Sequence, residues 1–231
     1  MTTTASTSSQ RTTLTRRRIL DAALAYIDTH GLDALSMHKL GAALGVKGMS
    51  LYNHVANKDD LLDGVVELLW SQVESEVERA APAEGGWRQG VRAFARALRD
   101  IVHRHPNAAP LITSQQIMPA PALRVVRAHI TAATEAGEPQ ERAYALLRAI
   151  TTYALGSALA EVSWGLGQAC APSVSDLLRP GIPDELAAVA EIFCGHGAPD
   201  AQFELGLDLM LRGLQSTQPA SPIASSTAPS A

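Results

Sequence analysis

Hydrogen-bonding side chains are concentrated between residues 46 and 62, in a stretch too short to bury much apolar surface. The sequence there is VKGMSLYNHVANKDDLL, and its neutral and basic polar residues are Lys47, Ser50, Tyr52, Asn53, His54, Asn57 and Lys58. Lysine and hydroxyl groups can neutralise or hydrogen-bond phosphates, and an asparagine amide can pair with the edge of adenine. These residue types therefore predict contacts with nucleic acid.

The elements that must hold this segment are predicted by helical periodicity in the first sixty residues. A first helix of about 15 residues ends at His30-Gly31, and its apolar positions are Ile19, Leu20, Ala23, Leu24 and Ile27. Ser36 is the expected N-cap of a second, short helix that Gly45 ends. A third short helix is expected over residues 48–55, and Asn57 is the expected cap of a fourth.

The order of helix, short helix, tight turn and short helix is typical of a helix-turn-helix, whose second helix lies in the major groove of DNA. We expect Leu40, Ala43 and Leu44 on the apolar side of the second helix, and Gly45 to supply the positive φ of the turn. With Leu51 and Val55 turned inward, the outer faces are left to residues Lys47, Gly48, Ser50, Tyr52, Asn53 and His54.

The charges are divided unevenly along the chain. The net charge of the 231 residues is −4, yet residues 1–58 carry seven Lys and Arg against three acids, a net of +4. The remainder is therefore −8, and all three lysines (Lys39, Lys47 and Lys58) lie in the basic part. A basic end on an acidic body indicates that only one end of the molecule meets a polyanion.

The segment RRRILDAALAYIDTHGLDALSMHKLGAALGVKGMSLYNHVANKDDLLDGV resembles, without a gap, the amino-terminal domain of TetR-family transcriptional repressors. Its most specific part is the G-V, LY-H and NKDDLL pattern. Trp87 and the segments YALGSALAE and FELGLDLMLRGL are similar to the carboxy-terminal domain of the tetracycline repressor branch of that family. The resemblance implies a DNA-binding repressor that is released by a small molecule.

The resemblance also implies roles for individual residues. It implies phosphate contacts from Ser36, Tyr52, His54 and Lys58, and groove contacts from His38, Gly48, Met49, Ser50 and Asn53. Gly48 stands where the tetracycline repressor has a polar residue, so a different operator sequence is expected. Tyr52 could instead pack against the first helix, and Lys58 could be a solvated charge. Residues 16–18 are either a charged first turn or a basic arm that enters the minor groove.

The rest of the chain has the pattern of an all-α protein. The fourth helix is expected to continue to about Arg79, and further helices are expected over residues 87–105, 120–136, 139–164, 184–193 and 200–214. We predict disordered tails at 1–14 and 215–231, a helix-turn-helix domain at 15–60, and a larger helical effector-binding and dimerisation domain at 61–214. The chain has no apolar run of the roughly 20 residues that a membrane span needs, and we expect a cytoplasmic protein without membrane contact.

The larger domain is predicted to form a homodimer, because a single small helix-turn-helix binds DNA weakly and two-fold pairing on a palindromic site is the usual remedy. Small residues on one helix and apolar residues on the last helix are the candidates for the pairing surface: Ala149, Gly156, Ala160, Phe203, Leu207 and Leu211. The alternative is that these residues only close the core of one protomer.

A cavity for an amphipathic or apolar effector is implied by the resemblance, and such sites are mostly apolar with a few polar groups. The candidate lining residues are Glu74, Phe94, Leu98, Ile112, Gln115, Gln116, Met118 and Trp164, and a plain core role is equally open for each aromatic among them. Ile112 occupies the position at which the tetracycline repressor holds a drug-bound magnesium with a histidine. A tetracycline–magnesium effector is therefore not expected.

Catalysis, cofactors and metals are not expected. His103 and His105 are two apart on a helix and do not share a face, so they would chelate a metal poorly. The sequence contains no glycine-rich phosphate loop, nucleophile elbow or HExxH run. Two alternatives stay open: a redox-responsive DNA-binding regulator that uses Cys170 or Cys194, and a helical dimeric scaffold without DNA binding.

Overall fold

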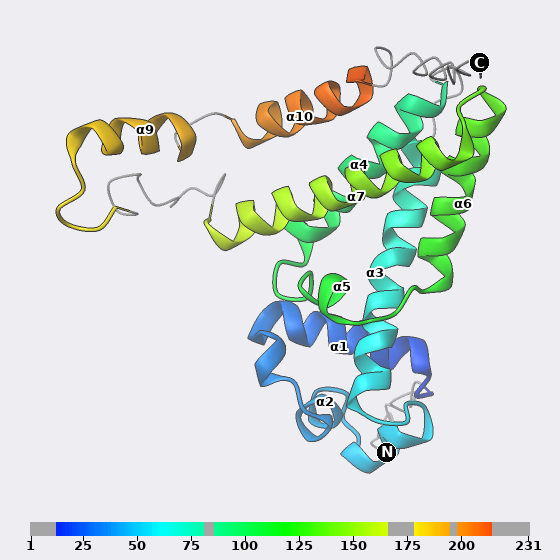
Figure 1. The fold of residues 1–231 in the computed structure, drawn as a ribbon. Helices are drawn as coiled ribbons and strands as arrows, with labels where there is room; N and C mark the ends of the chain where they lie inside the picture. The colour runs from blue at the N-terminus through cyan, green and yellow to red at the C-terminus, as the bar shows by residue number, and fades with distance from the viewer. Residues whose placement is uncertain (1–12, 81–85, 166–177, 195–197, 214–231) are drawn as a thin grey trace, which may run out of the picture. The chain divides into compact units, whose positions relative to one another are not determined.

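The computed structural model describes residues 13–80, 86–165, 178–194 and 198–213, and those residues form helices and no β-strand (Figure 1). The all-α prediction is confirmed. Two compact units divide the chain: Met1–Ala80 with Asp100–Ala128, and Ala81–Arg99 with His129–Ala231. No helix within the described part of the chain is both long and apolar enough to cross a membrane.

The first unit begins with α1 (Arg16–His30), a 3₁₀ turn at Leu32–Ala34, and α2 (Met37–Ala43). The Thr15 hydroxyl accepts a hydrogen bond from the Arg18 N–H (3.3 Å), and the Ser36 hydroxyl accepts one from the Lys39 N–H (3.2 Å). These bonds satisfy N–H groups that the first turn of a helix leaves unpaired. The predicted N-cap at Ser36 and the helix end before Gly31 are confirmed.

The turn after α2 leads into a 3₁₀ helix, η2 (Gly48–Asn53), where the sequence predicted a short helix over 48–55. Gly45 has φ +70°, as expected, and the Val46 N–H then bonds the Gly41 carbonyl oxygen at 2.9 Å. Ala43 is exposed, so the prediction that it faces the core is wrong. Ala43 ends α2, and the turn that follows carries the chain away and leaves its methyl group in solvent.

The long helix α3 (Lys58–Ala80) packs across α1. Asn57 caps it, as predicted, by accepting a hydrogen bond from the Asp60 N–H at 2.8 Å on its side-chain oxygen. A Cβ atom at Gly64 would lie 2.5 Å from a methyl carbon of Leu20, so the Leu20 side chain would have to move to admit a larger residue there. The core of this helix group is aliphatic: Ile19, Ala23, Ile27, Leu40, Leu51, Leu61, Val65 and Leu69 are each fully buried.

The first unit is completed by the end of α4 (Gly86–Arg104), by α5 (Leu111–Ser114) and by the start of α6 (Ala120–Glu135). His105 follows α4, and its Nδ1 lies 2.7 Å from an Asp28 carboxylate oxygen of α1. The amide of Asn107 donates to the Asp28 carbonyl oxygen at 2.9 Å. The chain after α4 is thereby attached to the end of α1. The predicted domain boundary at residue 60 falls inside α3.

The second unit contains the start of α4, the end of α6, α7 (Gln140–Ser163), α9 (Asp184–Cys194) and α10 (Pro199–Gly213). Helix α10 lies on α7, and the rings of Tyr153 and Phe203 stack with centroids 5.4 Å apart. The Tyr153 hydroxyl donates to the Phe203 carbonyl oxygen at 3.1 Å. Any side chain at Gly206 would collide with the Tyr153 phenol, so this glycine permits the close approach of the two helices.

Candidate nucleic-acid interface

Helix α2 and the turn η2 approach each other at backbone distance. A Cβ atom at Gly41 would lie 2.8 Å from the Gly48 nitrogen, and a Cβ atom at Gly48 would lie 3.1 Å from the Met37 carbonyl oxygen. Cβ atoms essentially never come as close as the Gly41 distance, and they rarely come as close as the Gly48 distance. Both positions therefore favour glycine. Gly48 therefore acts by letting η2 pack on α2, and it has no side chain with which to read a base.

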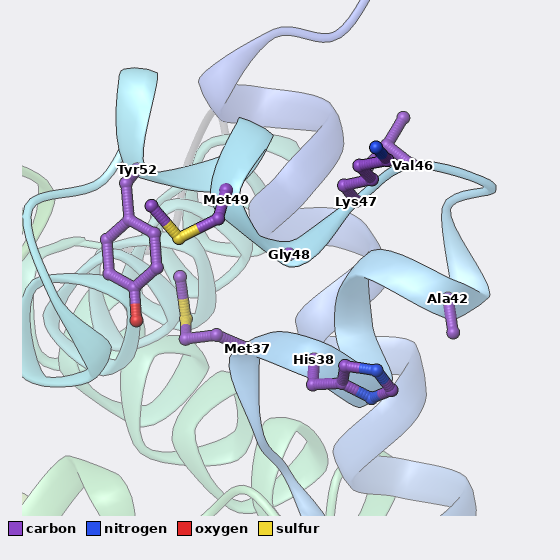
Figure 2. Close-up of a pocket in the computed structure, with 8 residues that line it drawn as sticks. All are labelled: Met37, His38, Ala42, Val46, Lys47, Gly48, Met49 and Tyr52. Carbon is purple, nitrogen blue, oxygen red and sulfur yellow. The ribbon is translucent and has the colours of Figure 1, made fainter.

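The outer side of this pair, where Figure 2 labels His38, Lys47, Gly48, Met49 and Tyr52, carries predicted DNA-binding residues, which are ten in all. Six of them are exposed, namely His38, Lys47, Met49, Tyr52, Asn53 and Lys58, and four are half-buried, namely Ser36, Gly48, Ser50 and His54. Leu51 and Val55 point inward and are buried, as the sequence predicted. The inward leucine and valine thus fix which face of η2 is presented to solvent.

A groove of about 550 Å³ runs between α2 and η2 on this side. Its lining residues are Met37, His38, Ala42, Val46, Lys47, Gly48, Met49 and Tyr52. Figure 2 shows the Met37 and Met49 side chains beside the Tyr52 ring, and His38 and Lys47 further along the groove. Tyr52 is 45% exposed, so its ring belongs to this surface more than to the core.

One ion pair ties the end of η2 to the start of α3. The Arg16 guanidinium donates to both carboxylate oxygens of Asp60, at 2.8 and 3.1 Å, and to the His54 carbonyl oxygen at 3.0 Å. Asp60 also accepts from the Ala56 N–H at 2.7 Å. The hydrogen bonds from Arg16 lower the pKa of the Asp60 carboxyl, and this pair raises the pKa of Arg16.

Sequence reasoning missed this role of Arg16, which it treated as part of a charged turn or of a minor-groove arm. The partners are 44 residues apart, and no local pattern connects them. Arg16 starts α1, and Asp60 lies in the first turn of α3. Only the three-dimensional structure shows that these two residues face each other. Arg17 differs, because it forms an exposed pair with Asp21 at 3.0 Å within its own helix.

The predicted effector-binding residues are divided between the two units. Glu74, Ile112, Gln115, Gln116 and Met118 belong to the first unit, and Phe94, Leu98 and Trp164 belong to the second. Glu74 accepts two hydrogen bonds from Arg124, at 2.6 and 2.7 Å, and this pairing lowers the pKa of the Glu74 carboxyl. Phe94 is fully buried, and its ring centroid lies 5.2 Å from that of His129.

The predicted dimerisation residues have two different environments within the second unit. Ala149, Gly156 and Ala160 are exposed on α7, whereas Phe203, Leu207 and Leu211 are buried against the unit's own core. The large apolar side chains that α10 does expose are Leu205 and Leu209, at 61% and 65%. Sequence reasoning passed over these two leucines, although their spacing of four residues marks a common face of the helix.

The residues considered for metal or redox chemistry give no such site in the described structure. His105 is engaged with Asp28 and with the Gln72 side-chain oxygen, the latter at 3.2 Å. No group of three or more His, Cys, Asp or Glu residues among the described ones could hold a metal ion. Cys170 lies outside the described residues, and Cys194 ends α9 with a side chain that is likewise outside them.

Fold and surface together define a class: an all-α helix-turn-helix regulator. The outer face of α2 and η2, here called the reading face, exposes polar and basic side chains together with Met49 and Tyr52. Two family models match the chain: "Bacterial regulatory proteins, tetR family" at residues 19–65 and "Tetracyclin repressor-like, C-terminal domain" at residues 80–218. The chain belongs to the TetR family of transcriptional regulators, which is not a family of enzymes. The resemblance noted in the sequence is confirmed.

Relatives of the same kind match over most of the chain. An HTH-type transcriptional regulator of Saccharopolyspora erythraea is 30% identical over 88% of this chain and 86% of its own length. The HTH-type transcriptional repressor DrrR1 of Streptomyces coeruleorubidus is 30% identical over 88% of this chain and 78% of its own. The structure of Streptomyces coelicolor ActR in complex with actinorhodin is 29% identical, with a TM-score of 0.72 over 89% of this chain and 98% of that one.

Proposed function

We propose that this regulator binds a palindromic double-stranded operator as a homodimer, and that a small-molecule effector releases it. The observation that carries the proposal is the outer face of α2 and η2, where exposed polar and basic side chains stand on a turn fixed by buried Leu51 and Val55. Such a turn presents its residues to the major groove of DNA. A regulator of transcription acts where the chromosome lies, which supports a cytoplasmic location.

Two groups of residues have different tasks in this proposal. Tyr52, His54 and Lys58, with Ser36 at the start of α2, contact phosphates and set the register of the protein on DNA. His38, Ser50 and Asn53 contact base edges. The Ser36 hydroxyl oxygen already accepts a hydrogen bond from the Lys39 N–H. The Ser36 hydroxyl proton can therefore be donated to a phosphate oxygen.

Dimerisation brings two reading turns to half-sites one helical turn apart, about 34 to 36 Å. The exposed faces of α7 and α10 support this arrangement. Ala149, Gly156 and Ala160 offer a smooth surface for close approach on α7, and exposed Leu205 and Leu209 offer apolar area on α10. Burial of these two leucines against a second copy is favourable, at about 25 cal/mol per Å² of apolar surface.

An apolar or amphipathic effector is supported by the relative ActR, for which complexes with actinorhodin and with (S)-DNPA are described. In the mechanism we propose, the effector binds the larger helical domain and favours a state in which the spacing of the two reading turns no longer matches DNA. Ile112, half-buried in α5, is not a metal ligand, and this agrees with an effector other than a tetracycline–magnesium complex.

The experiment is a fluorescence-anisotropy titration of the full chain with DNA from upstream of its own gene, repeated at several salt concentrations. Removing the exposed Lys58 ammonium (Lys58→Ala) should weaken binding to all sequences and flatten the salt dependence by about one ion per protomer. Arg127→Ala removes one exposed positive charge from α6 and is the matched control. Binding of the wild-type chain that never exceeds nonspecific background would refute the proposal.

Asn53→Ala separates base reading from phosphate contact. Loss of the amide should lower affinity for the operator by about 5- to 150-fold, equivalent to about 1–3 kcal/mol, while binding to unrelated DNA stays unchanged. If Asn53→Ala and Lys58→Ala both bind like the wild type, the assignment of roles to these residues is incorrect even if the protein binds DNA.

A further inference from the structure

Among the described residues of the first unit, the most exposed large apolar side chain lies on the reading face. Met49 is 76% exposed, at the second position of η2. Surfaces scatter single apolar residues, but Met49 is not alone, because it lines the same groove as Met37 and the ring of Tyr52 (Figure 2). The centre of the reading face is therefore an apolar patch, with Lys47 and His38 further along the groove.

The main chains of α2 and η2 approach each other closely beside this patch. Gly48 precedes Met49 in the chain, and a Cβ atom there would be 3.1 Å from the Met37 carbonyl oxygen and 3.3 Å from the His38 Cα. Two thioether groups and one aromatic ring, from Met37, Met49 and Tyr52, are among the groups that line the groove of about 550 Å³. Neither thioether can donate a hydrogen bond, and sulfur accepts one only weakly.

An apolar patch facing the major groove has one apolar counterpart on DNA, the C5-methyl group of thymine. We propose that Met49, with Met37 and Tyr52 beside it, binds a thymine methyl group and thereby selects thymine at one position of each half-site. The inference rests on the proposed operator binding and adds to it the chemistry of one contact. In this proposal, Asn53 hydrogen-bonds the edge of one base, and Met49 makes an apolar contact with the thymine of a different base pair.

The size of the effect follows from the burial of one methyl group. Removing that group from the DNA should weaken binding about three- to four-fold for one half-site, and about ten-fold when both half-sites are changed. Met49→Ala should lower affinity for thymine-containing DNA by a comparable factor. Met49→Leu restores an apolar side chain of similar volume and should keep most of the preference.

The test begins with selection of binding sites from a randomised duplex library by the full-length protein. In the selected site each thymine is then replaced by deoxyuridine, which lacks only the methyl group, and affinities are measured by anisotropy. We expect one thymine per half-site at which the replacement weakens binding of the wild type, and we expect that penalty to vanish in Met49→Ala. Leu123→Ala, which truncates an exposed leucine of α6, is the control and should keep the full penalty.

The outcomes separate this inference from the proposed function. A wild-type chain that selects a sequence but binds every deoxyuridine version equally well overturns the methyl contact and leaves operator binding intact. A deoxyuridine penalty that persists unchanged in Met49→Ala overturns the role of Met49. A chain that selects no sequence at all overturns the proposed function itself.

Discussion

The helix-turn-helix and the α7–α10 layer are held together in different ways. The first closes on fully buried aliphatic residues such as Ile19, Leu40 and Leu51, and its outward polar side chains are left to solvent. In the second, one side of α10 packs Phe203 and Leu207 on the core. The carboxylates of α10 form ion pairs with arginines of α4.

The arginine contacts of α10 form a ladder. Arg92 and Arg96 donate to the two oxygens of Glu204, at 2.6 and 2.5 Å, and Arg92 also binds Asp208. Arg99 reaches Asp200 at 2.7 Å and the buried Glu161 of α7 at 2.8 Å. The ladder places positive charge along α4 and negative charge along α10, so ion pairs add to the packing of Phe203 and Leu207 in holding α10.

This difference suggests a division of labour. The helix-turn-helix at residues 15–60, called the reading head from here on, is closed by aliphatic packing and should keep one shape, since tightly packed interiors have few alternative arrangements. A helix attached through ion pairs depends on pH and salt, because such pairs gain less as charges are screened or protonated. The head is thus built for fixed geometry, and α10 is held by interactions that solution conditions can weaken.

The largest expected effect comes from removing one buried leucine from each region. Leu51→Ala and Leu207→Ala each leave a cavity at a fully buried site and should each cost about 2–5 kcal/mol in free energy of unfolding. Leu51→Ala should abolish specific DNA binding while the dimer persists, because its cavity lies under η2. Leu207→Ala should instead weaken the dimer. Calorimetry, light scattering and anisotropy on the same samples test this.

If Leu51→Ala and Leu207→Ala lose DNA binding and dimerisation to the same degree, the two regions do not have separate roles. Leu123→Ala again serves as the control, since truncation of an exposed leucine should change the unfolding free energy by no more than about 0.5 kcal/mol.

A smaller effect is expected from the one long-range ion pair described in the reading head. Asp60→Asn removes the carboxylate that accepts two hydrogen bonds from Arg16, and Arg16 also holds the His54 carbonyl oxygen at the end of η2. Loss of a negative charge near DNA should by itself strengthen binding. If Arg16 and Asp60 position η2, binding should weaken instead, by about five-fold, equivalent to about 1 kcal/mol.

Asp21→Asn is the matched control for this prediction. It also removes one acid from the same domain, but it breaks only the exposed pair with Arg17 inside α1. The control should bind DNA as well as the wild type or better. Stronger binding by Asp60→Asn, equal to that of Asp21→Asn, would show that the Arg16 pair has no positioning role.

The sequence predicted well what depends on neighbours in the chain. The N-cap at Ser36, the positive φ of Gly45 and the cap at Asn57 each follow from one residue type at one place in a local pattern. The helical spans agree with the structure within a few residues, because their apolar periodicity and their glycine and proline stops are also local.

Contacts between distant residues could not be predicted in the same way. Arg16 and Asp60 are 44 residues apart, and Arg92 and Asp208 are 116 apart, so any of many acids could have been the partner. The burial of Phe203 and the exposure of Leu205 depend on which side of α10 meets α7. A helix that is apolar on two sides does not reveal from sequence which side is covered by its own chain.

The smallest expected effect concerns the pH dependence of the α10 ladder. Hydrogen bonds from Arg96 and Arg92 lower the pKa of the Glu204 carboxyl in the folded protein, against a weaker opposing effect of burial. A lowered folded-state pKa means that the stabilisation is fully present above the unfolded value of about 4.3 and is lost as the pH falls through the folded value. The midpoint temperature of thermal unfolding should therefore decrease when the pH is lowered below about 4.

Glu204→Gln should remove the part of the acid sensitivity of unfolding that is due to the Glu204 carboxyl. Because Glu204 is partly exposed, its contribution is at most about 1 kcal/mol, which corresponds to roughly 2–4 °C in the midpoint for a chain of this size. The variant should melt lower than the wild type at pH 7, and the two curves should converge toward pH 3. Glu185→Gln, an exposed acid of α9, controls for the loss of one negative charge. Parallel curves for Glu204→Gln and the wild type would mean that the pairs of Glu204 with Arg92 and Arg96 contribute nothing to the acid sensitivity of the protein.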